Sequence, residues 1–250
     1  MIRFILVAVT VVGFLILSIP LLIVEWIIGK FNKRAKDISS LRIVQAVFRL
    51  ILWLTGVKVT IIGKENIPVG QPVLYIGNHR SYFDILLTYI HCPDLTGYVA
   101  KDSMEKIPLL SNWMRYLHCQ FLDRKDIRKG MKTILTCIDL IKEGISICIF
   151  PEGTRNRAES DLEMMEFHEG SFKPATRTNC PIIPMAISNS CSMFEKQAPK
   201  IYKTHVILEY CKPIIPSELS KEEKKRIGAY TQNVILETLK KNEALLPGNK

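Results

Sequence analysis

The sequence predicts an α/β fold, with a mostly parallel central sheet flanked by helices and an N-terminal membrane-associated helical pair. Short apolar runs alternate with longer amphipathic ones from residue 57 onward, which is typical of a parallel sheet covered on both faces. A long uncharged stretch lies near the N-terminus, and 48% of the 250 residues are apolar, enough for a substantial core. We therefore divide the chain into residues 1–56, a membrane anchor with an interfacial helix, and residues 57–250, a globular domain.

The first segment, Phe4–Val24, contains 21 residues without a charge. As a helix it would be about 31 Å long, enough to cross the core of a bilayer. It is longer than the apolar part of a signal peptide, and no small-residue cleavage site closes it. Pro20 can kink this helix, so a hairpin that enters one leaflet remains an alternative. The positive charges that follow predict that the rest of the chain lies on the cytoplasmic side of the cell membrane: Lys30, Lys33, Arg34 and Lys36.

A second helix is expected over Ser39–Trp53. Arg42, Gln45 and Arg49 share one narrow stripe of it, at i, i+3 and i+7, while the remainder is almost wholly apolar. Such a helix is too polar to span a bilayer, so we expect it to lie along the membrane surface with both arginines among the head groups. The alternative is an ordinary helix packed on the domain.

From residue 57 the apolar runs predict seven strands and the amphipathic runs four helices. The strands are expected at Val57–Ile62, Val73–Ile76, Gly97–Ala100, Cys119–Leu122, Ile145–Phe150, Ile182–Ile187 and Val206–Tyr210. The helices are expected at Tyr82–Ile90, Leu109–His118, Ile127–Glu143 and Lys221–Lys241. Asp126 can cap the third helix, and Gly144 can end it. The acidic loop over residues 157–172 is a candidate lid or rim.

Polar residues follow four of the predicted strands. In an open α/β sheet, ligands bind beyond the carboxyl ends of the strands, so these side chains are expected to gather at one edge. They place one histidine among three cations, a setting suited to an anion beside a general base. The residues are His79, Lys101, Asp123 with Arg124, and Glu152 with Arg155.

The spacing of His79 and Asp84 has two readings. On one regular helix, side chains at i and i+5 would diverge, so the two can meet only if His79 lies in the turn before a helix and Asp84 in its first turn. Ser81 marks such a boundary. The alternative is a capping box in which Asp84 only satisfies helix amides, and the two roles are compatible. A histidine oriented by an aspartate can accept a hydroxyl proton at neutral pH.

The stretch Phe150–Arg155 reads as an anion-binding loop. Pro151 and Gly153 shape a tight turn, and Arg155 offers a planar fork that matches phosphate oxygens. The alternative is a surface turn with a solvated arginine. Since the sequence contains no G-x-S-x-G elbow, a serine hydrolase is not expected, and the bound substrate must supply the nucleophile.

Net charge and cysteine content limit the classes of partner and the compartment that the chain fits. The formal net charge of +10 suits anionic lipid, acidic proteins or nucleic acid. Nucleic-acid binding is not expected, because the cations do not alternate with aromatic residues along a groove. The seven cysteines have no paired spacing, which is typical of reduced thiols in a reducing compartment. No cluster of metal ligands is visible, so neither a metal nor a cofactor is expected.

Four ordered segments resemble the motifs of the glycerolipid acyltransferase family, and most closely its bacterial 1-acyl-sn-glycerol-3-phosphate acyltransferases of the PlsC type. The resemblance extends over residues 70–213. The segments are NHRSYFD at Asn78–Asp84, FLDR at Phe121–Arg124, FPEGTRNR at Phe150–Arg157 and CPIIPMAIS at Cys180–Ser188. Four motifs in order are far more specific than any one of them.

The resemblance implies a role for each matched position. His79 would be the general base and Asp84 would orient it. The residues implied in acceptor binding are Lys101, Arg124, Glu152, Gly153, Thr154 and Arg155, and those in the acyl-donor region are Pro181, Ile183 and Pro184. One departure is Phe167–Gly170, where relatives often carry a lysine before the glycine and this chain has His168.

The resemblance further implies an enzyme of phospholipid biosynthesis that transfers an acyl group from acyl-ACP or acyl-CoA to lysophosphatidic acid, forming phosphatidic acid, at a membrane whose lipids it contacts. The acyl donor stays open at this stage. Two alternatives also stay open: a member of the same family that acts on glycerol 3-phosphate or another lysophospholipid, and a non-enzymatic basic protein of the membrane surface.

Overall fold

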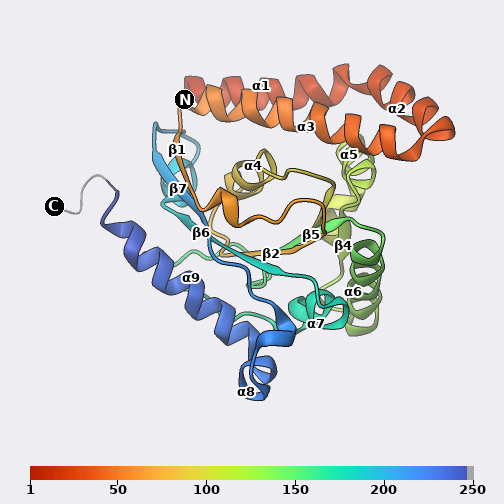
Figure 1. The fold of residues 1–250 in the computed structure, drawn as a ribbon. Coiled ribbons are helices and arrows are strands. Elements are labelled where there is room, and N and C mark those ends of the chain that lie inside the picture. The colour runs from red at the N-terminus through yellow and green to blue at the C-terminus, as the bar shows by residue number, and fades with distance from the viewer. Residues whose placement is uncertain (247–250) are drawn as a thin grey trace.

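The structure is a computed structural model and describes residues 1–246. Its centre is a seven-stranded sheet with strand order β1-β7-β6-β2-β5-β3-β4 (Figure 1). Five strands run in one direction, and β7 pairs antiparallel with β6, so that β7 and its parallel neighbour β1 run the other way. The strands are β1 (Lys58–Ile62), β2 (Leu74–Gly77), β3 (Thr96–Lys101), β4 (Gln120–Leu122), β5 (Ser146–Ile149), β6 (Ile182–Ser188) and β7 (His205–Tyr210). The predicted fold class and all seven strands are confirmed.

Helices cover both faces of the sheet, as expected for right-handed crossovers between parallel strands. The crossovers from β2 to β3 and from β3 to β4 place α4 and α5 on one face, and those returning to β5 and β6 place α6 and α7 on the other, with α9 (Figure 1). These helices are α4 (Phe83–Tyr89), α5 (Leu110–Tyr116), α6 (Ile127–Lys142), α7 (Lys173–Thr178), α8 (Lys221–Lys225) and α9 (Ile227–Glu243).

Three of the four predicted helices of the domain form. Asp126 caps α6 by accepting bonds from the amides of Arg128 and Lys129, and Gly144 follows it with a φ of 86°. The helix expected over Lys221–Lys241 is instead broken at Arg226 into α8 and α9. The short helix α7 was not predicted, because its six residues carry too little periodicity.

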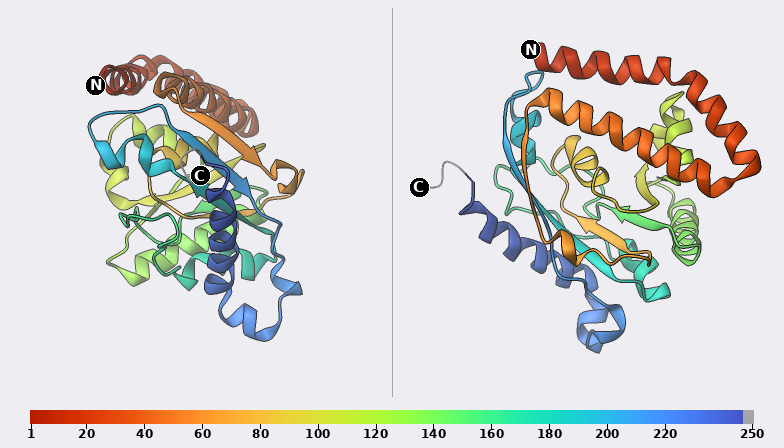
Figure 2. Two further views of the ribbon diagram at one scale, coloured as in Figure 1. Left: turned by 90° about the vertical axis from the view of Figure 1, so that its left-hand side faces the viewer. Right: turned by 45° about the horizontal axis from the view of Figure 1, so that its top comes forward.

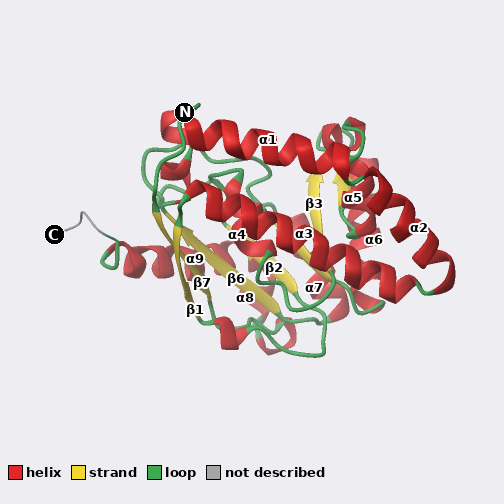
Figure 3. Cartoon of the chain, turned by 90° about the horizontal axis from the view of Figure 1, so that it is seen from above, coloured by secondary structure: helices red, strands yellow, loops and turns green. Residues whose placement is uncertain are grey.

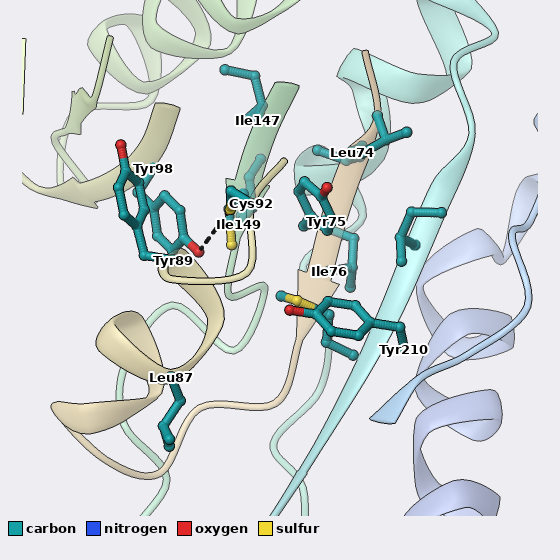
Figure 4. Close-up of a cluster of buried hydrophobic side chains, with 14 of the residues drawn as sticks. Leu74, Tyr75, Ile76, Leu87, Tyr89, Cys92, Tyr98, Ile147, Ile149 and Tyr210 are labelled. Atoms are coloured by element: carbon teal, nitrogen blue, oxygen red, sulfur yellow. Dashed lines mark hydrogen bonds between the residues drawn. The ribbon is translucent and has the colours of Figure 1, made fainter. Parts of the chain in front are cut away.

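The core lies on both faces of the central strands. Leu74 and Ile76 of β2 and Ile147 of β5 are fully buried, and Tyr89 and Tyr98 pack beside them (Figure 4). Strands buried on both faces are nearly continuous apolar runs, which is why the sequence identified them. All seven cysteines are buried and unpaired.

Three helices precede the sheet: α1 (Ile2–Leu17), α2 (Ile19–Phe31) and α3 (Lys33–Thr55). The single helix expected over Phe4–Val24 is wrong, since the chain bends by 49° between α1 and α2 at Ser18 (Figure 2). Pro20 lies in the first turn of α2. Because proline has no backbone N–H, it cannot donate the hydrogen bond that would continue α1 into α2 as one regular helix. The kink that the sequence allowed is therefore present.

The placement of the α3 stripe corrects the sequence-based expectation. Gln45 donates to the carbonyls of Tyr89 and Cys92, and the Arg42 and Arg49 guanidinium groups reach the carbonyls of Pro93 and Ile90. The polar stripe thus faces the end of α4, not lipid head groups. The alternative reading was right: α3 packs on the domain, above α4 and α5.

Helices α1 and α2 lie alongside α3 (Figure 3), and Phe14 of α1 contacts Trp113 of α5. No residue of α1 is buried, and Glu25 is the only buried residue of α2. By length and composition α3 could cross a membrane, and so could α1 and α2 if they formed one span. The exposed face of α1 and α2 is rich in large apolar side chains: Ile2, Ile5, Leu6, Val9, Val12, Ile16, Leu17, Ile23, Val24, Trp26 and Ile27.

Candidate active site

The site lies at the carboxyl ends of β2 and β5, which are neighbours in the sheet. The chain leaves β2 toward α4 on one face and leaves β5 toward α7 on the other, the arrangement that puts the ligand crevice of an open α/β sheet beside these two strand ends. The loop after β2 carries His79, and the loop after β5 carries Glu152 and Arg155.

Asn78 fixes the start of the first loop. Its side-chain amide donates to the carbonyl of Ile187, and its side-chain oxygen accepts from the amide of Ile187, both at 2.9 Å. These two side-chain bonds take the place of the backbone pairing between β2 and β6 at this position, directly after β2 ends at Gly77.

His79 and Asp84 meet as the sequence predicted. His79 Nδ1 lies 2.9 Å from Asp84 Oδ2, and Asp84 is fully buried in the first turn of α4. The amides of Arg80 and Ser81 both donate to the same Oδ2 at 2.7 Å, which fixes the carboxylate. Phe150 stacks on the imidazole, with ring centroids 4.3 Å apart. Because Nδ1 is occupied by Asp84, Nε2 is the nitrogen that can serve a substrate hydroxyl.

Ser81 and Asp84 also make hydrogen bonds to backbone amides at the start of α4, as the capping interpretation predicted. Ser81 Oγ accepts from the amide of Phe83 at 3.0 Å, while the Asp84 carboxylate accepts from the amide of Ser81. The same carboxylate therefore ends the turn and orients the histidine. The two readings of the H-x4-D spacing do not compete here.

Glu152 joins the two loops. Its Oε1 accepts from the amide of His79 and its Oε2 from the amide of Met165, each at 2.9 Å, and the residue is only 2% exposed. Burial raises the pKa of the Glu152 carboxyl, although these two amide bonds oppose the shift. With both oxygens bonded to backbone, Glu152 connects the histidine turn to the acidic loop predicted over residues 157–172.

The turn after Glu152 is tight. Gly153 donates to the carbonyl of Phe150 at 3.0 Å and has a φ of 72°, a conformation that favours glycine. A Cβ on Gly153 would lie 3.4 Å from the ring of His168, the residue found where relatives often carry lysine. Thr154 is exposed beside this turn.

Arg155 is held against the site by two neighbours. Its guanidinium carbon lies 3.4 Å from the centre of the Tyr82 ring, and its Nη1 lies 3.4 Å from Glu195 Oε1. The same Glu195 oxygen accepts from the amide of Tyr82 at 2.7 Å. Arg155, Tyr82 and Glu195 line a cavity of about 420 Å³.

Arg80 was missed by the sequence analysis. The Arg80 residue is 97% buried, and its Nε lies 3.1 Å from Asp161 Oδ1. The two other guanidinium nitrogens donate to the carbonyls of Ala158 and Ser160. Arg80 thereby fastens the acidic loop to the histidine turn. An arginine beside a candidate catalytic histidine was the available signal, but its partners are about 80 positions away in the sequence.

Lys101 and Arg124 lie farther from the histidine. Lys101 ends β3 and Arg124 follows β4, and both side chains are exposed. Since β4 is three strands from β2, its carboxyl end is displaced by about 14 Å across the sheet. The structure thus brings His79, Asp84 and Glu152 together, places Arg155 against Tyr82 and Glu195 in the loop after Glu152, and leaves Lys101 and Arg124 at the side of the crevice.

Pro181, Ile183 and Pro184 are buried in the sheet. Ile183 and Pro184 belong to β6 and pair with Tyr75 and Ile76 of β2, and the Pro181 carbonyl accepts from the amide of Leu74. They form part of the wall behind the histidine turn. Across residues 1–246, no group of three or more His, Cys, Asp or Glu side chains is arranged to hold a metal ion.

Comparisons with known proteins agree on one kind of chemistry. The family described as Acyltransferase matches residues 58–188. A protein of Borreliella burgdorferi named 1-acyl-sn-glycerol-3-phosphate acyltransferase is 32% identical over 80% of either chain. A protein of Saccharomyces cerevisiae with the same name is 28% identical over 77% of this chain and 63% of its own length.

One solved structure has the same fold. The crystal structure of the 1-acyl-sn-glycerophosphate (LPA) acyltransferase PlsC from Thermotoga maritima superposes with a TM-score of 0.79 over 97% of both chains, at 23% sequence identity. The likeness includes the N-terminal helices, because the superposition covers nearly the whole chain.

Proposed function

Since this chain belongs to the acyltransferase family, we propose that it transfers a fatty acyl group from a thioester to the sn-2 hydroxyl of 1-acyl-glycerol-3-phosphate, yielding phosphatidic acid. The observation that carries the proposal is the His79–Asp84 pair in the crevice between β2 and β5, with the Arg155 guanidinium in the next loop. Relatives named for this reaction support the choice of acceptor.

The reaction uses the substrate's own hydroxyl as the nucleophile. His79 Nε2 takes the proton of the hydroxyl as its oxygen attacks the thioester carbonyl carbon, and the tetrahedral intermediate collapses with loss of the C–S bond. The imidazolium then returns the proton to the departing thiolate. Asp84 holds Nδ1–H, which fixes the tautomer and stabilises the positive charge that forms on the ring.

Arg155 binds the phosphate of the acceptor. A guanidinium can donate two parallel hydrogen bonds to a phosphate, which fixes the direction of the glycerol backbone as well as its position. Lys101 and Arg124, at the side of the crevice, add to the positive potential that attracts the dianionic head group. Gly153 and Thr154 shape the same turn, and the wall of Pro181, Ile183 and Pro184 contributes to the acyl-donor region.

The acceptor is a membrane lipid, and the exposed apolar face of α1 and α2 indicates membrane association. We assign residues 1–56 to this attachment and residues 57–250 to catalysis. The cluster of Lys30, Lys33, Arg34 and Lys36 after the apolar segment favours a cytoplasmic position for the catalytic domain.

Acceptor dependence tests this proposal. The purified protein is supplied with acyl-CoA and, separately, with acyl carrier protein thioester, and offered lysophosphatidic acid, glycerol 3-phosphate or a lysophospholipid with a diester head group. We expect acyl transfer to lysophosphatidic acid to exceed transfer to the other acceptors. Transfer to glycerol 3-phosphate or to the diester alone would assign the enzyme to another member of the family. Absence of transfer to every acceptor would favour a non-enzymatic protein of the membrane surface.

A further inference from the structure

Helix α6 carries a row of exposed apolar side chains. Ile127, Met131 and Leu135 follow one another at i, i+4 and i+8, and they are 82%, 51% and 53% exposed. The opposite side of the helix is in the core, through Cys137, Leu140 and Ile141. Large apolar residues in a contiguous row on an otherwise amphipathic helix are typical of an interaction surface.

Positive charges flank this row. Lys125, Arg128 and Lys132 are exposed and form no ion pair within the described residues, whereas Lys129 lies within 4 Å of Asp123 and Asp126. Arg128 and Lys132 are one turn apart, so their like charges repel, which costs helix stability unless an anionic partner is present. We call Lys125, Ile127, Arg128, Met131, Lys132 and Leu135 the α6 surface.

The position of the α6 surface excludes the membrane that α1 and α2 contact. Helix α6 lies on the face of the sheet opposite to α3, α4 and α5, and α1 and α2 lie alongside α3 on that other face (Figure 1). A bilayer on the outer face of α1 and α2 therefore cannot also cover α6. A second copy of the chain is disfavoured as well, because two α6 surfaces would bring like charges together.

The α6 surface is also close to the chemistry. Helix α6 begins five residues after β4, whose carboxyl end lies on the same edge of the sheet as His79. Strand β4 lies about 14 Å across the sheet from β2, and α6 begins one short loop beyond β4, so a donor bound at α6 needs a long flexible arm to place its thioester at the histidine.

We propose that the α6 surface docks a small acidic protein that carries the acyl group as a thioester on a flexible arm. Acidic side chains of the carrier pair with Lys125, Arg128 and Lys132, its apolar residues cover Ile127, Met131 and Leu135, and the arm delivers the thioester to His79. The inference rests on the proposed acyl transfer and adds the surface on which a carrier-protein donor binds.

A charge reversal tests the docking. The variant Arg128→Glu/Lys132→Glu is compared with Lys221→Glu/Lys225→Glu, which changes the net charge equally on exposed positions of α8. Acyl transfer to lysophosphatidic acid is measured with acyl carrier protein and with acyl-CoA as donors. We expect kcat/KM for the carrier protein to fall at least tenfold in the α6 variant, through KM, with kcat/KM for acyl-CoA unchanged. The α8 variant should match the wild type with both donors.

A binding measurement separates the docking from the reaction. Fluorescence anisotropy of a labelled acyl carrier protein should show binding to wild type and to the α8 variant, weakening with salt, and at least tenfold weaker binding to the α6 variant. Unchanged carrier binding in the α6 variant, an equal kinetic loss with acyl-CoA, or weaker binding to anionic vesicles alone would each overturn the proposal. Carrier binding through α6 without acyl transfer from either donor would uphold the docking and reject the proposed reaction.

Discussion

Two histidine–aspartate pairs in this protein have nearly the same geometry and different surroundings. His79 Nδ1 lies 2.9 Å from Asp84, and His118 Nε2 lies 2.8 Å from Asp37. In both pairs the aspartate is almost fully buried and the histidine side chain is largely covered. The contact between the two side chains therefore does not identify a catalytic site.

The surroundings of the first pair fit the reaction that we propose. Asp84 is fixed by two backbone amides, the imidazole stacks on Phe150, and Arg155 is in the next loop. The pair lies at the carboxyl ends of β2 and β5, and the His79 side chain is 15% exposed.

The second pair lies between the N-terminal helices and the domain. Asp37 belongs to α3 and also contacts Lys36, while His118 follows α5. Other polar bonds cross the same boundary: the Trp113 indole donates to Ser18 Oγ, and the Tyr116 hydroxyl donates to the carbonyl of Leu22. We infer that this pair fastens the helices that contact the membrane to the domain that carries the chemistry.

The largest effect is expected from a substitution of Asp84. Asp84→Asn replaces an anion that accepts from two amides and from His79, so the histidine loses both its orientation and its counter-charge. We expect kcat for acyl transfer to fall by about 10²–10⁴-fold, with the folded state intact by circular dichroism. An active Asp84→Asn enzyme would show that the pair does not drive proton transfer.

Glu152→Gln should have the next largest effect. A glutamine can accept from only one of the two amides of His79 and Met165, and leaving a buried amide unpaired costs about 1–3 kcal/mol. We expect kcat to fall by about ten- to a hundredfold, because the histidine turn loses its connection to the acidic loop. Measuring kcat and KM separately distinguishes this positioning role from direct contact with the acceptor, in which KM would rise instead.

Asp37→Asn should reduce stability and leave the chemistry intact. The loss of a mostly buried charge that contacts Lys36 and His118 should lower the free energy of unfolding by about 1–3 kcal/mol at neutral pH, with kcat within about threefold of wild type. Burial raises the pKa of Asp37, but the hydrogen bonds and charges of His118 and Lys36 outweigh it and hold the pKa below its usual value. The contribution of the carboxylate is therefore complete above the usual pKa and disappears as the pH falls through the lower one.

The stability difference between wild type and Asp37→Asn should accordingly be constant near neutral pH and shrink below about pH 4. Denaturant unfolding of both proteins at several pH values measures it. A difference that grows in acid would contradict the assigned direction.

The smallest effect is expected at Glu195. This carboxylate lies beside Arg155 and competes with the acceptor phosphate for its guanidinium. Glu195→Gln keeps an acceptor for the amide of Tyr82 and removes the competing charge. We expect KM for lysophosphatidic acid to fall by about two- to fivefold at unchanged kcat, and a rise in KM would show that Glu195 instead helps to hold Arg155 in place.

Much of this architecture could be predicted from the sequence because it depends on local patterns. The seven strands are apolar runs that are buried on both faces, and the H-x4-D spacing with Ser81 contained the geometry of the first pair. The Arg42–Gln45–Arg49 stripe was misplaced, because a polar stripe on an apolar helix suits a lipid head group and a row of backbone carbonyls equally well.

The rest depends on contacts between distant residues. Arg80 and the acidic loop, Arg155 and Glu195, and His118 and Asp37 are separated by about 40 to 80 positions, so no spacing in the sequence joins them. The second histidine–aspartate pair was invisible for that reason, although the first was recognised at once.

The central claim is that surroundings, not pair geometry, decide which histidine does chemistry. The most direct test is to measure acyl transfer and unfolding for His79→Ala and His118→Ala side by side. The account predicts that His79→Ala loses at least a hundredfold in kcat while remaining folded, and that His118→Ala keeps kcat within a few fold while unfolding more easily. Substantial activity in folded His79→Ala, or a comparable loss of kcat in folded His118→Ala, would contradict it.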